Sequence, residues 1–524
     1  GQAALQGNTI GENNTAVGYW ALLSNTTASY NTAVGYQSLD ANTTGARNNA
    51  FGAISLGANT TGQYNTSMGH ASMASNTTGN NNVALGYDAL NANTTASNNT
   101  AVGFESIKFS TTGANNVASG YRSLHKNTTG GNNSAFGYEA MYENNTASEN
   151  TAVGYQSMYS SVTGTNNTSL GFQSLYSNTT NNNTALGYKS MYSTTSGATN
   201  TAVGYETLLT STTGTQNVAV GDRVLRASTT GSYNTALGAL ALFANTSASN
   251  NTAVGYQAAY STTTDGENTA VGSQAFYSNT TGNRNVALGK EALYSNTTAD
   301  GNTAVGFEAA LNSTTPELNA AFGFQALRTN TTGATNTAIG ASALYSNTTA
   351  SSNTSVGYQS GYNNTTGQFN VLLGYQAGYR SAGTGSIGDA SVFIGYRAGY
   401  ANQGNNNVGI GNGSLDDNTT GTFNVAVGQG SLSANTTASY GVAVGSGALA
   451  ANTTGARNNA LGYNALNANT TGYYNVAIGH ASMTTNTTGQ ENTSVGYEAL
   501  KDNTTGTQNF AIGAFALDDA TTGS

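Results

Sequence analysis

The sequence predicts an all-β fold, a parallel β-solenoid (β-roll) of about thirty coils, each seventeen residues long. Two observations predict it. A unit close to Gly-Tyr-Gln-Ala-Leu-Tyr-Ser-Asn-Thr-Thr-Gly-x-x-Asn-Thr-Ala-Val recurs along the whole 524-residue chain. The glycine that closes each Asn-x-Ala-Val-Gly unit, here called the register glycine, recurs from Gly1 to Gly513, and 27 of the 30 intervals have this same length. So short a repeat cannot bury its own apolar face, and successive copies must therefore stack.

Each copy contains two short apolar segments separated by turn residues. The first is Thr-Ala-Val-Gly-Tyr, as at 32–36, and the second is Ala/Ser-Leu-Tyr, as at 174–176. The Asn-Thr-Thr-Gly between them contains residues that accept positive φ or bond to neighbouring backbone. Apolar residues do not recur at helical steps of three and four, which excludes a helical repeat. We therefore expect strand, turn, strand and turn in every coil.

Four columns of equivalent residues define the expected interior. We predict a core made of the residue just before the register glycine and the Leu or Met four residues after it, as in Val34 and Leu39. The Ala or Ser two residues before the glycine forms a face of small residues, which implies close packing of the other strand or of another chain. Asn stands four residues before the glycine in 28 of 30 copies, and we expect a structural hydrogen-bonded ladder there.

The repeat is irregular in one block. We expect one continuous rod with regular coils over 1–374, irregular coils with an insertion over 375–411, and regular coils over 412–524. Glycine replaces the core Leu at Gly361, Gly378 and Gly399, where an adjacent Tyr should fill the space, and a four-residue insertion falls within 380–392. This block is the expected place for a protruding loop, a kink or a junction.

Composition excludes several classes of function. Only 7% of residues are charged, the net charge is −9, and the 14 basic residues are scattered, so no nucleic-acid partner is expected. The chain has no cysteine and no apolar run long enough to span a membrane. The three histidines, His70, His125 and His480, are single substitutions in different copies. We therefore expect no enzyme activity, no metal site and no cofactor.

Two surface features are candidates for recognition. Aromatic residues recur one and five residues after the register glycine, and these ladders either pack together or offer a platform for sugar rings or a partner. The candidate contact residues are Tyr142, Tyr159, Tyr176 and Tyr294. The Asn-Thr-Thr turns are formal N-glycosylation acceptors, although turn chemistry alone also explains them. The candidate glycosylation residues are Asn25, Asn42, Asn59, Asn76, Asn127 and Asn178.

The Asn-x-Ala-Val-Gly unit, as at 31–35 and 251–255, resembles the head repeats of YadA-like trimeric autotransporter adhesins and related repeats of bacterial and phage fibre proteins. The resemblance covers essentially the whole chain, but the period of seventeen is longer than that of the head repeat. It implies a left-handed parallel β-roll in a homotrimeric fibre on a cell surface or virion, used for attachment.

We therefore expect a structural or adhesive extracellular fibre or filament subunit. Its partners would be further copies of itself, as a homotrimer or an end-to-end filament, and a carbohydrate or cell-surface ligand. The alternative is an ice- or polysaccharide-binding solenoid that uses its Thr or Tyr ladders, which requires one flat, exposed, regular face. A solenoid enzyme such as a polysaccharide lyase would need Asp, Arg or Lys clustered within a few coils, and no such cluster is evident in the sequence.

Overall fold

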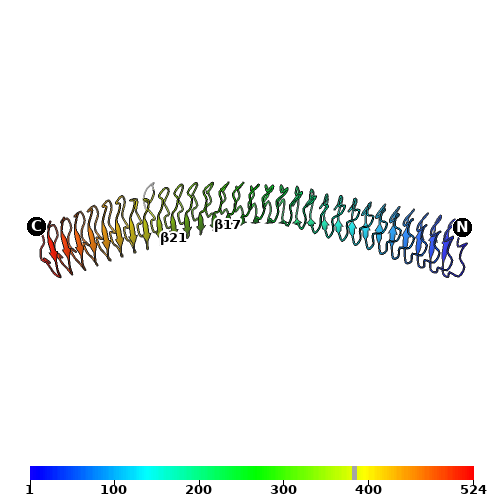
Figure 1. Cartoon of the computed structure of the whole chain (residues 1–524), viewed down its shortest axis with the longest axis horizontal. Coiled ribbons are helices and arrows are strands. Elements are labelled where there is room, and N and C mark those ends of the chain that lie inside the picture. Colours follow the sequence, from blue (N-terminus) through cyan, green and yellow to red (C-terminus); the bar gives the residue numbers. More distant parts are fainter. Residues whose placement is uncertain (381–385, 524) are drawn as a thin grey trace. The chain divides into compact units, whose positions relative to one another are not determined.

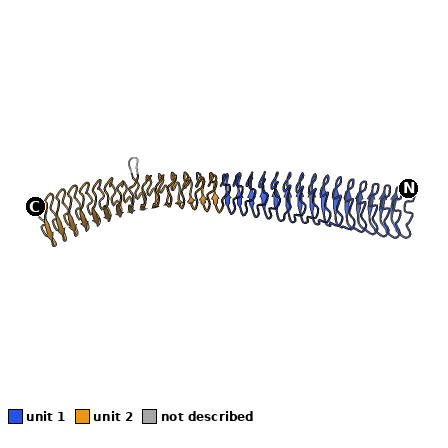
Figure 2. Cartoon of the chain, turned by 45° about the horizontal axis from the view of Figure 1, so that its top comes forward, with its two compact units in different colours: residues 1–264 blue, residues 265–524 orange. Residues whose placement is uncertain are grey.

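The computed structural model describes residues 1–380 and 386–523. The chain forms two compact units, residues 1–264 (unit 1) and 265–524 (unit 2), coloured separately in Figure 2. Within each unit, coils that carry one strand each stack in sequence order (Figure 1). The paired strands run parallel, which confirms the predicted parallel β-solenoid. None of the described residues belongs to a helix that is long and apolar enough to cross a membrane.

Fifteen strands of three residues each lie in unit 1. They are β1 (Thr15–Val17), β2 (Thr32–Val34), β3 (Asn49–Phe51), β4 (Thr66–Met68), β5 (Val83–Leu85), β6 (Thr100–Val102), β7 (Val117–Ser119), β8 (Ser134–Phe136), β9 (Thr151–Val153), β10 (Thr168–Leu170), β11 (Thr184–Leu186), β12 (Thr201–Val203), β13 (Val218–Val220), β14 (Thr235–Leu237) and β15 (Thr252–Val254). Each strand from β1 to β14 pairs in register with the strand of the next coil, as Ala16 of β1 does with Ala33 of β2.

The described residues of unit 2 also contain fifteen three-residue strands. They are β16 (Thr269–Val271), β17 (Val286–Leu288), β18 (Thr303–Val305), β19 (Ala320–Phe322), β20 (Thr337–Ile339), β21 (Thr354–Val356), β22 (Val371–Leu373), β23 (Val392–Ile394), β24 (Val408–Ile410), β25 (Val425–Val427), β26 (Val442–Val444), β27 (Asn459–Leu461), β28 (Val476–Ile478), β29 (Thr493–Val495) and β30 (Phe510–Ile512).

The second apolar segment of each coil is not a strand, so that part of the prediction is wrong. Gln37 and Leu39 both adopt left-handed backbone conformations, with φ of 52° and 51°. These conformations are unfavourable for residues with a side chain. They persist because the N–H groups still bond from coil to coil: Gln37 N donates to Tyr19 O at 2.9 Å and Leu39 N to Ser55 O at 3.0 Å.

Fewer columns of residues are buried in each coil than the sequence predicts. Ala33, at the centre of β2, and Leu39 are both fully buried, whereas Val17 and Met68, just before their register glycines, are 57% and 48% exposed. Successive strand residues face opposite sides, so burying the central Ala turns both of its neighbours outward. The prediction is confirmed for the Leu column and wrong for the residue before the glycine. The small strand residues pack closely against the other arm of the solenoid, as where Ser55 Oγ donates to Ser67 Oγ at 2.8 Å.

The register glycine is required by its backbone. Gly35 has a φ of 139°, and a Cβ placed on it would overlap the carbonyl oxygen of Gly52 in the next coil. Any side chain there would collide with main chain, which cannot move aside without separating the coils. This explains why the glycine marks the repeat so regularly.

The predicted asparagine ladder is present and buried. Asn48 N donates to Asn31 Oδ1 at 2.9 Å, and Asn48 Nδ2 donates to Gly62 O at 2.8 Å. Both side chains are fully buried. The ladder therefore satisfies most of its interior polar groups, with Asn31 Nδ2 and Asn370 Nδ2 as exceptions. It fixes the chain entering each strand, which is a structural role.

In the irregular block, the large core side chain stands on the strand and the small residue stands on the turn arm, the reverse of the usual coil. Leu372 and Phe393 stand at the centres of β22 and β23, where most other coils have Ala or Ser. They fill the space beside Gly361, Gly378 and Gly399. The expectation that a neighbouring Tyr fills it is wrong, because those tyrosines stay in their ladder. The four-residue insertion is predicted within 380–392, and residues 381–385 of that stretch lie outside the described residues.

Candidate interaction surfaces

The six asparagines of the candidate glycosylation sites lie inside the solenoid. Asn25, Asn42, Asn59, Asn76, Asn127 and Asn178 are all fully buried. Asn42 Nδ2, the atom that a glycan would occupy, donates to Asn25 Oδ1 at 3.0 Å and to Gly45 O at 2.9 Å. We call this ladder, seven residues after the register glycine, the turn Asn column. A glycan at this nitrogen is incompatible with the folded coil, because it would replace a hydrogen bond and has no room.

The candidate contact tyrosines form a packed ladder, here called the inner ladder. Tyr142 stacks on Tyr159 with centroids 5.2 Å apart, Tyr159 on Tyr176 at 5.1 Å, and Tyr277 on Tyr294 at 5.0 Å. Burial and nearby charges raise the pKa of Tyr159 to about 12. Because neighbours cover the ring faces, these tyrosines offer edges and hydroxyls to a ligand. A sugar ring stacked on a tyrosine face has no place within this ladder.

The outer side of the strands is exposed and apolar in both units. It consists of the residue before each register glycine and the aromatic residue after it, and we call it the apolar strand face. The aromatic residues stack here too, with Tyr121 and Tyr138 at 5.0 Å, and His70 and His480 occupy positions in the same stack. Exposed members include Phe51, Met68, Phe136, Leu170, Leu237, Phe322, Ile339, Leu461 and Ile478.

The first threonine of each Asn-Thr-Thr turn uses its hydroxyl within the solenoid. Thr43 Oγ1 donates to Thr60 O in the next coil at 3.1 Å, and the same bond recurs at Thr60 and Thr77. On the strands, the column of Thr three residues before the glycine is broken by Val83 and Val117. Neither of these two columns is a free and unbroken threonine array. Nine residues after the register glycine, however, a Thr is exposed in eight successive coils of unit 1, from Thr27 to Thr146, so ice binding stays an open alternative.

Charged side chains gather in four successive coils of unit 1. Lys108 Nζ lies 2.9 Å from Asp88 Oδ2 and 2.7 Å from Glu105 Oε1, and Arg122 Nε lies 2.7 Å from Glu105 Oε2. Burial tends to raise the pKa of Glu105, but hydrogen bonds from Lys108 and Arg122 outweigh it and hold the pKa below its usual value. The expectation of no cluster of charges within a few coils is thus wrong. The four side chains Asp88, Glu105, Lys108 and Arg122 are all engaged in these ion pairs.

His125 belongs to this cluster and to the inner ladder. Its ring stacks on Tyr142 at 5.0 Å, and Nδ1 lies 3.0 Å from the carbonyl oxygen of Glu105. Burial lowers its pKa, despite the opposing effect of the Glu105 carbonyl. Among the described residues, no group of three His, Cys, Asp or Glu side chains is placed to hold a metal ion.

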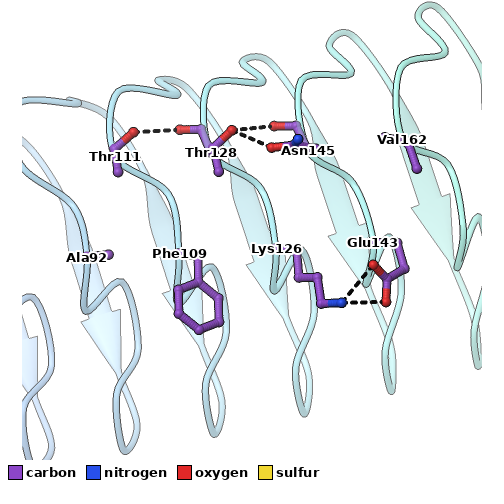
Figure 3. A pocket seen from close by; sticks show the side chains of 8 residues that line it. All are labelled: Ala92, Phe109, Thr111, Lys126, Thr128, Glu143, Asn145 and Val162. Carbon is purple, nitrogen blue, oxygen red and sulfur yellow. Dashed lines mark hydrogen bonds and ion pairs between the residues drawn. The ribbon is translucent and has the colours of Figure 1, made fainter.

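A groove of about 520 Å³ lies beside the cluster (Figure 3). Its walls are two columns, six and eight residues after the register glycine, here called the groove columns. Ala92, Phe109, Lys126 and Glu143 form one wall, and Thr111, Thr128, Asn145 and Val162 form the other. Lys126 Nζ donates to both oxygens of Glu143 at 2.8 Å across successive coils. Phe109 is 44% exposed.

The sequence held a signal for this groove. Six residues after the register glycine most coils have Ala, Ser or Thr, as in Ala41, Ala58 and Ser75. Phe109, Lys126 and Glu143 break that column in three successive coils. The signal appears only when each column is compared along the chain, because none of the three residues forms a motif by itself.

Comparison with known proteins does not assign the chain to a family. No model of a protein family matches the chain, and no curated protein matches it significantly.

Proposed function

We propose that the chain is a structural and adhesive subunit of an extracellular fibre, which self-associates through the apolar strand face. The observation that carries this proposal is the exposure of large apolar side chains on the outer side of successive strands in both units. Contiguous exposed apolar surface of this extent is unusual in soluble monomers and marks interaction sites. The repeat architecture, which resembles fibre head repeats, supports an attachment role on a cell surface or virion.

Another copy of the chain is the partner that fits this face best. The apolar residues recur once per coil, and stacked rings in successive coils are 5.0–5.3 Å apart. A partner that covers every coil must present apolar groups at the same spacing, which a second copy does by construction. A homotrimer, as the resemblance implies, would cover the face on each chain.

The expected energies require contact over many coils. Fully burying one Val, Leu or Phe side chain contributes about 1.5–3 kcal/mol, so covering a half-exposed one contributes about 1 kcal/mol per coil. Association costs about 4–15 kcal/mol in lost freedom. A few coils could not hold a partner, whereas the fifteen strands of one unit can.

The mass of the full chain in solution tests the proposal, measured by sedimentation and light scattering. We expect an oligomer for the native chain and dissociation for a variant with Met68→Asp, Phe136→Asp and Leu170→Asp on the apolar strand face. The matched control carries Thr44→Asp, Thr61→Asp and Thr129→Asp, which are exposed turn positions in unit 1 and should leave the oligomer intact.

Three results would overturn the proposal. One is a native chain that stays monomeric at high concentration. Another is an oligomer that survives the strand-face substitutions. In that case, electron micrographs of particles whose lengths are whole multiples of one chain's length would show end-to-end assembly. The third is dissociation by the turn substitutions to the same extent as by those on the strand face.

A further inference from the structure

The groove in unit 1 departs from the repeat in both of its walls at once. Phe109, Lys126 and Glu143 replace the small residues usual in the first groove column, and Asn145 and Val162 replace the Thr that is usual in the second. Neither set of changes is needed for the coil, since the surrounding coils fold with Ala or Ser and with Thr at these positions. Departures that coincide at one surface site indicate a local function.

The side chains that line the groove have distinct chemical capacities. Figure 3 shows the Phe109 ring with one face turned toward the viewer. The Lys108 ammonium lies over the ring, 5.7 Å from its centroid. The ring is held from the side by His125, which it meets edge-on at 5.0 Å and 85°. This leaves a flat apolar surface of fixed orientation beside the groove. Ala92 and Val162 extend the apolar lining at its two ends.

Polar groups stand further along the groove. Lys126 and Glu143 hold each other through two hydrogen bonds, so the ammonium and the carboxylate are fixed side by side. Thr128 Oγ1 donates to the Asn145 side-chain oxygen and to the Asn145 carbonyl oxygen. This orients the Asn145 amide, whose Nδ2 makes no hydrogen bond within the part of the chain that the structure describes. A fixed donor, a fixed acceptor and an oriented amide thus face one apolar ring.

We propose that this groove binds a pyranose-containing oligosaccharide. A pyranose ring has an apolar C–H face that stacks on an aromatic ring, and an edge of hydroxyls that donate and accept at the same time. Those hydroxyls match an ammonium donor beside a carboxylate acceptor, where charge-assisted hydrogen bonds are strong. The mixture of apolar lining and few oriented polar groups is typical of small-ligand sites.

Other ligands fit the groove less well. An anion would meet the Glu143 carboxylate, and a cation would meet the Lys126 ammonium, so the paired charges disfavour both. A purely apolar ligand would remove water from the exposed ion pair without replacing its hydrogen bonds. A neutral ligand with many hydroxyl groups avoids each of these costs.

This inference deepens the adhesive part of the proposed function and rests on it, because the oligosaccharide would be what the fibre attaches to. The two are measured separately. Oligomer mass reports the assembly, and saccharide binding reports the groove, so failure of one is distinguishable from failure of the other.

The test uses the full chain on a glycan array, followed by ligand-observed NMR with lactose, maltotriose, N,N′-diacetylchitobiose and 3′-sialyllactose. We expect binding of at least one neutral saccharide. Phe109→Ala should weaken it about tenfold or more, because a central aromatic contact is lost. Alanine already stands in this column at Ala92, so the coil is expected to fold. Phe109→Tyr should retain binding.

Matched controls separate the groove from the rest of the surface. Phe369→Ala removes an exposed phenylalanine of unit 2, and Glu149→Gln neutralises an exposed carboxylate of unit 1 outside the groove; both should bind like the native chain. Glu143→Gln should weaken binding because it releases Lys126. The proposal is overturned if no saccharide binds, if only 3′-sialyllactose binds, or if Phe109→Ala binds as tightly as Phe369→Ala.

Discussion

Leu372 occupies the space that a side chain at Gly361 would need. A Cβ built on Gly361 would lie 2.8 Å from Leu372 Cδ1, and equally close to Leu344 Cδ2. In most coils the large residue stands on the turn arm and the small one on the strand, as in Leu39 and Ala33. Gly361 and Leu372 supply the same volume with the two sides exchanged. The interior therefore constrains the sum of two side chains more strongly than either one.

Restoring the usual arrangement should show this coupling. Leu372→Ala alone should destabilise unit 2 by about 2–5 kcal/mol through a cavity. Gly361→Leu alone should destabilise it by about 1–3 kcal/mol through overpacking. The double variant should be close to the native chain, since it reproduces the majority coil. Urea unfolding of all four proteins in a double-mutant cycle measures the coupling, and simple additivity of the two losses would contradict it.

The sequence predicted the repeat, the register and the asparagine ladder because each depends on identity at a fixed spacing. It did not predict which strand residues face inward. A strand of three residues, such as β2, offers too little alternation to show whether Ala33 or Val34 faces the interior. Side-chain size favours Val34 as the core residue, and that prediction is wrong. Ala33 faces the interior together with Leu39 of the other apolar segment, an arrangement that no local pattern encodes.

The groove was missed for a related reason. Lys126 and Glu143 are one full repeat apart and look unrelated in the sequence, yet one coil of stacking brings their charges within 2.8 Å. In a solenoid, the relevant neighbours of a residue lie one period away on either side. The pair is visible in the sequence only as two successive departures from the small residues of one column.

The turn Asn column has gaps where a stabilising substitution is expected. Asn93 Oδ1 is buried without a hydrogen-bond partner, and the next residue in the column is Ser110 instead of Asn. Ser110→Asn should supply a donor to Asn93 and an acceptor to Asn127, and stabilise these coils by about 1–2 kcal/mol. Hydrogen exchange of residues 103–120 measures the effect where local opening occurs.

Thr112→Asn is the control for that substitution, because it adds the same side chain at an exposed turn position of the same coil. It should leave hydrogen exchange unchanged. Equal protection in the two variants, or faster exchange in Ser110→Asn, would show that the missing amide does not limit the stability of these coils.

Burial of the turn Asn column predicts where glycans can be attached. In a host that glycosylates secreted proteins, the folded fraction should carry no glycan at Asn59, which is buried, whereas Asn98 is exposed and begins the acceptor sequence Asn98-Asn99-Thr100. Peptide mass spectrometry of the folded fraction, before and after enzymatic removal of glycans, measures occupancy at both. A glycan on Asn59 in folded protein would contradict the interior position of this column.

His125 should make the stability of unit 1 depend on pH. Burial lowers its pKa in the folded state below the usual 6.5, so the unfolded chain binds the proton more readily. The stabilising contribution is therefore complete above about pH 6.5 and is lost as the pH falls through the folded pKa. The Glu105 carboxylate near it has its own pKa lowered below 4.5, so its contribution is lost only in more acidic solution. Between these two ranges the histidine should dominate the slope.

Replacing the histidine by the usual residue of the inner ladder isolates that slope. His125→Tyr should flatten the dependence of the unfolding free energy on pH between about 6.5 and 5, because Tyr stays neutral there. His70→Tyr, at an exposed position of the apolar strand face, is the matched control and should leave the slope in place. Urea unfolding of each variant at several pH values measures it. If His125→Tyr keeps the native slope while His70→Tyr loses it, the buried histidine is not the group that senses pH, and its stacking on Tyr142 is then purely a packing contact.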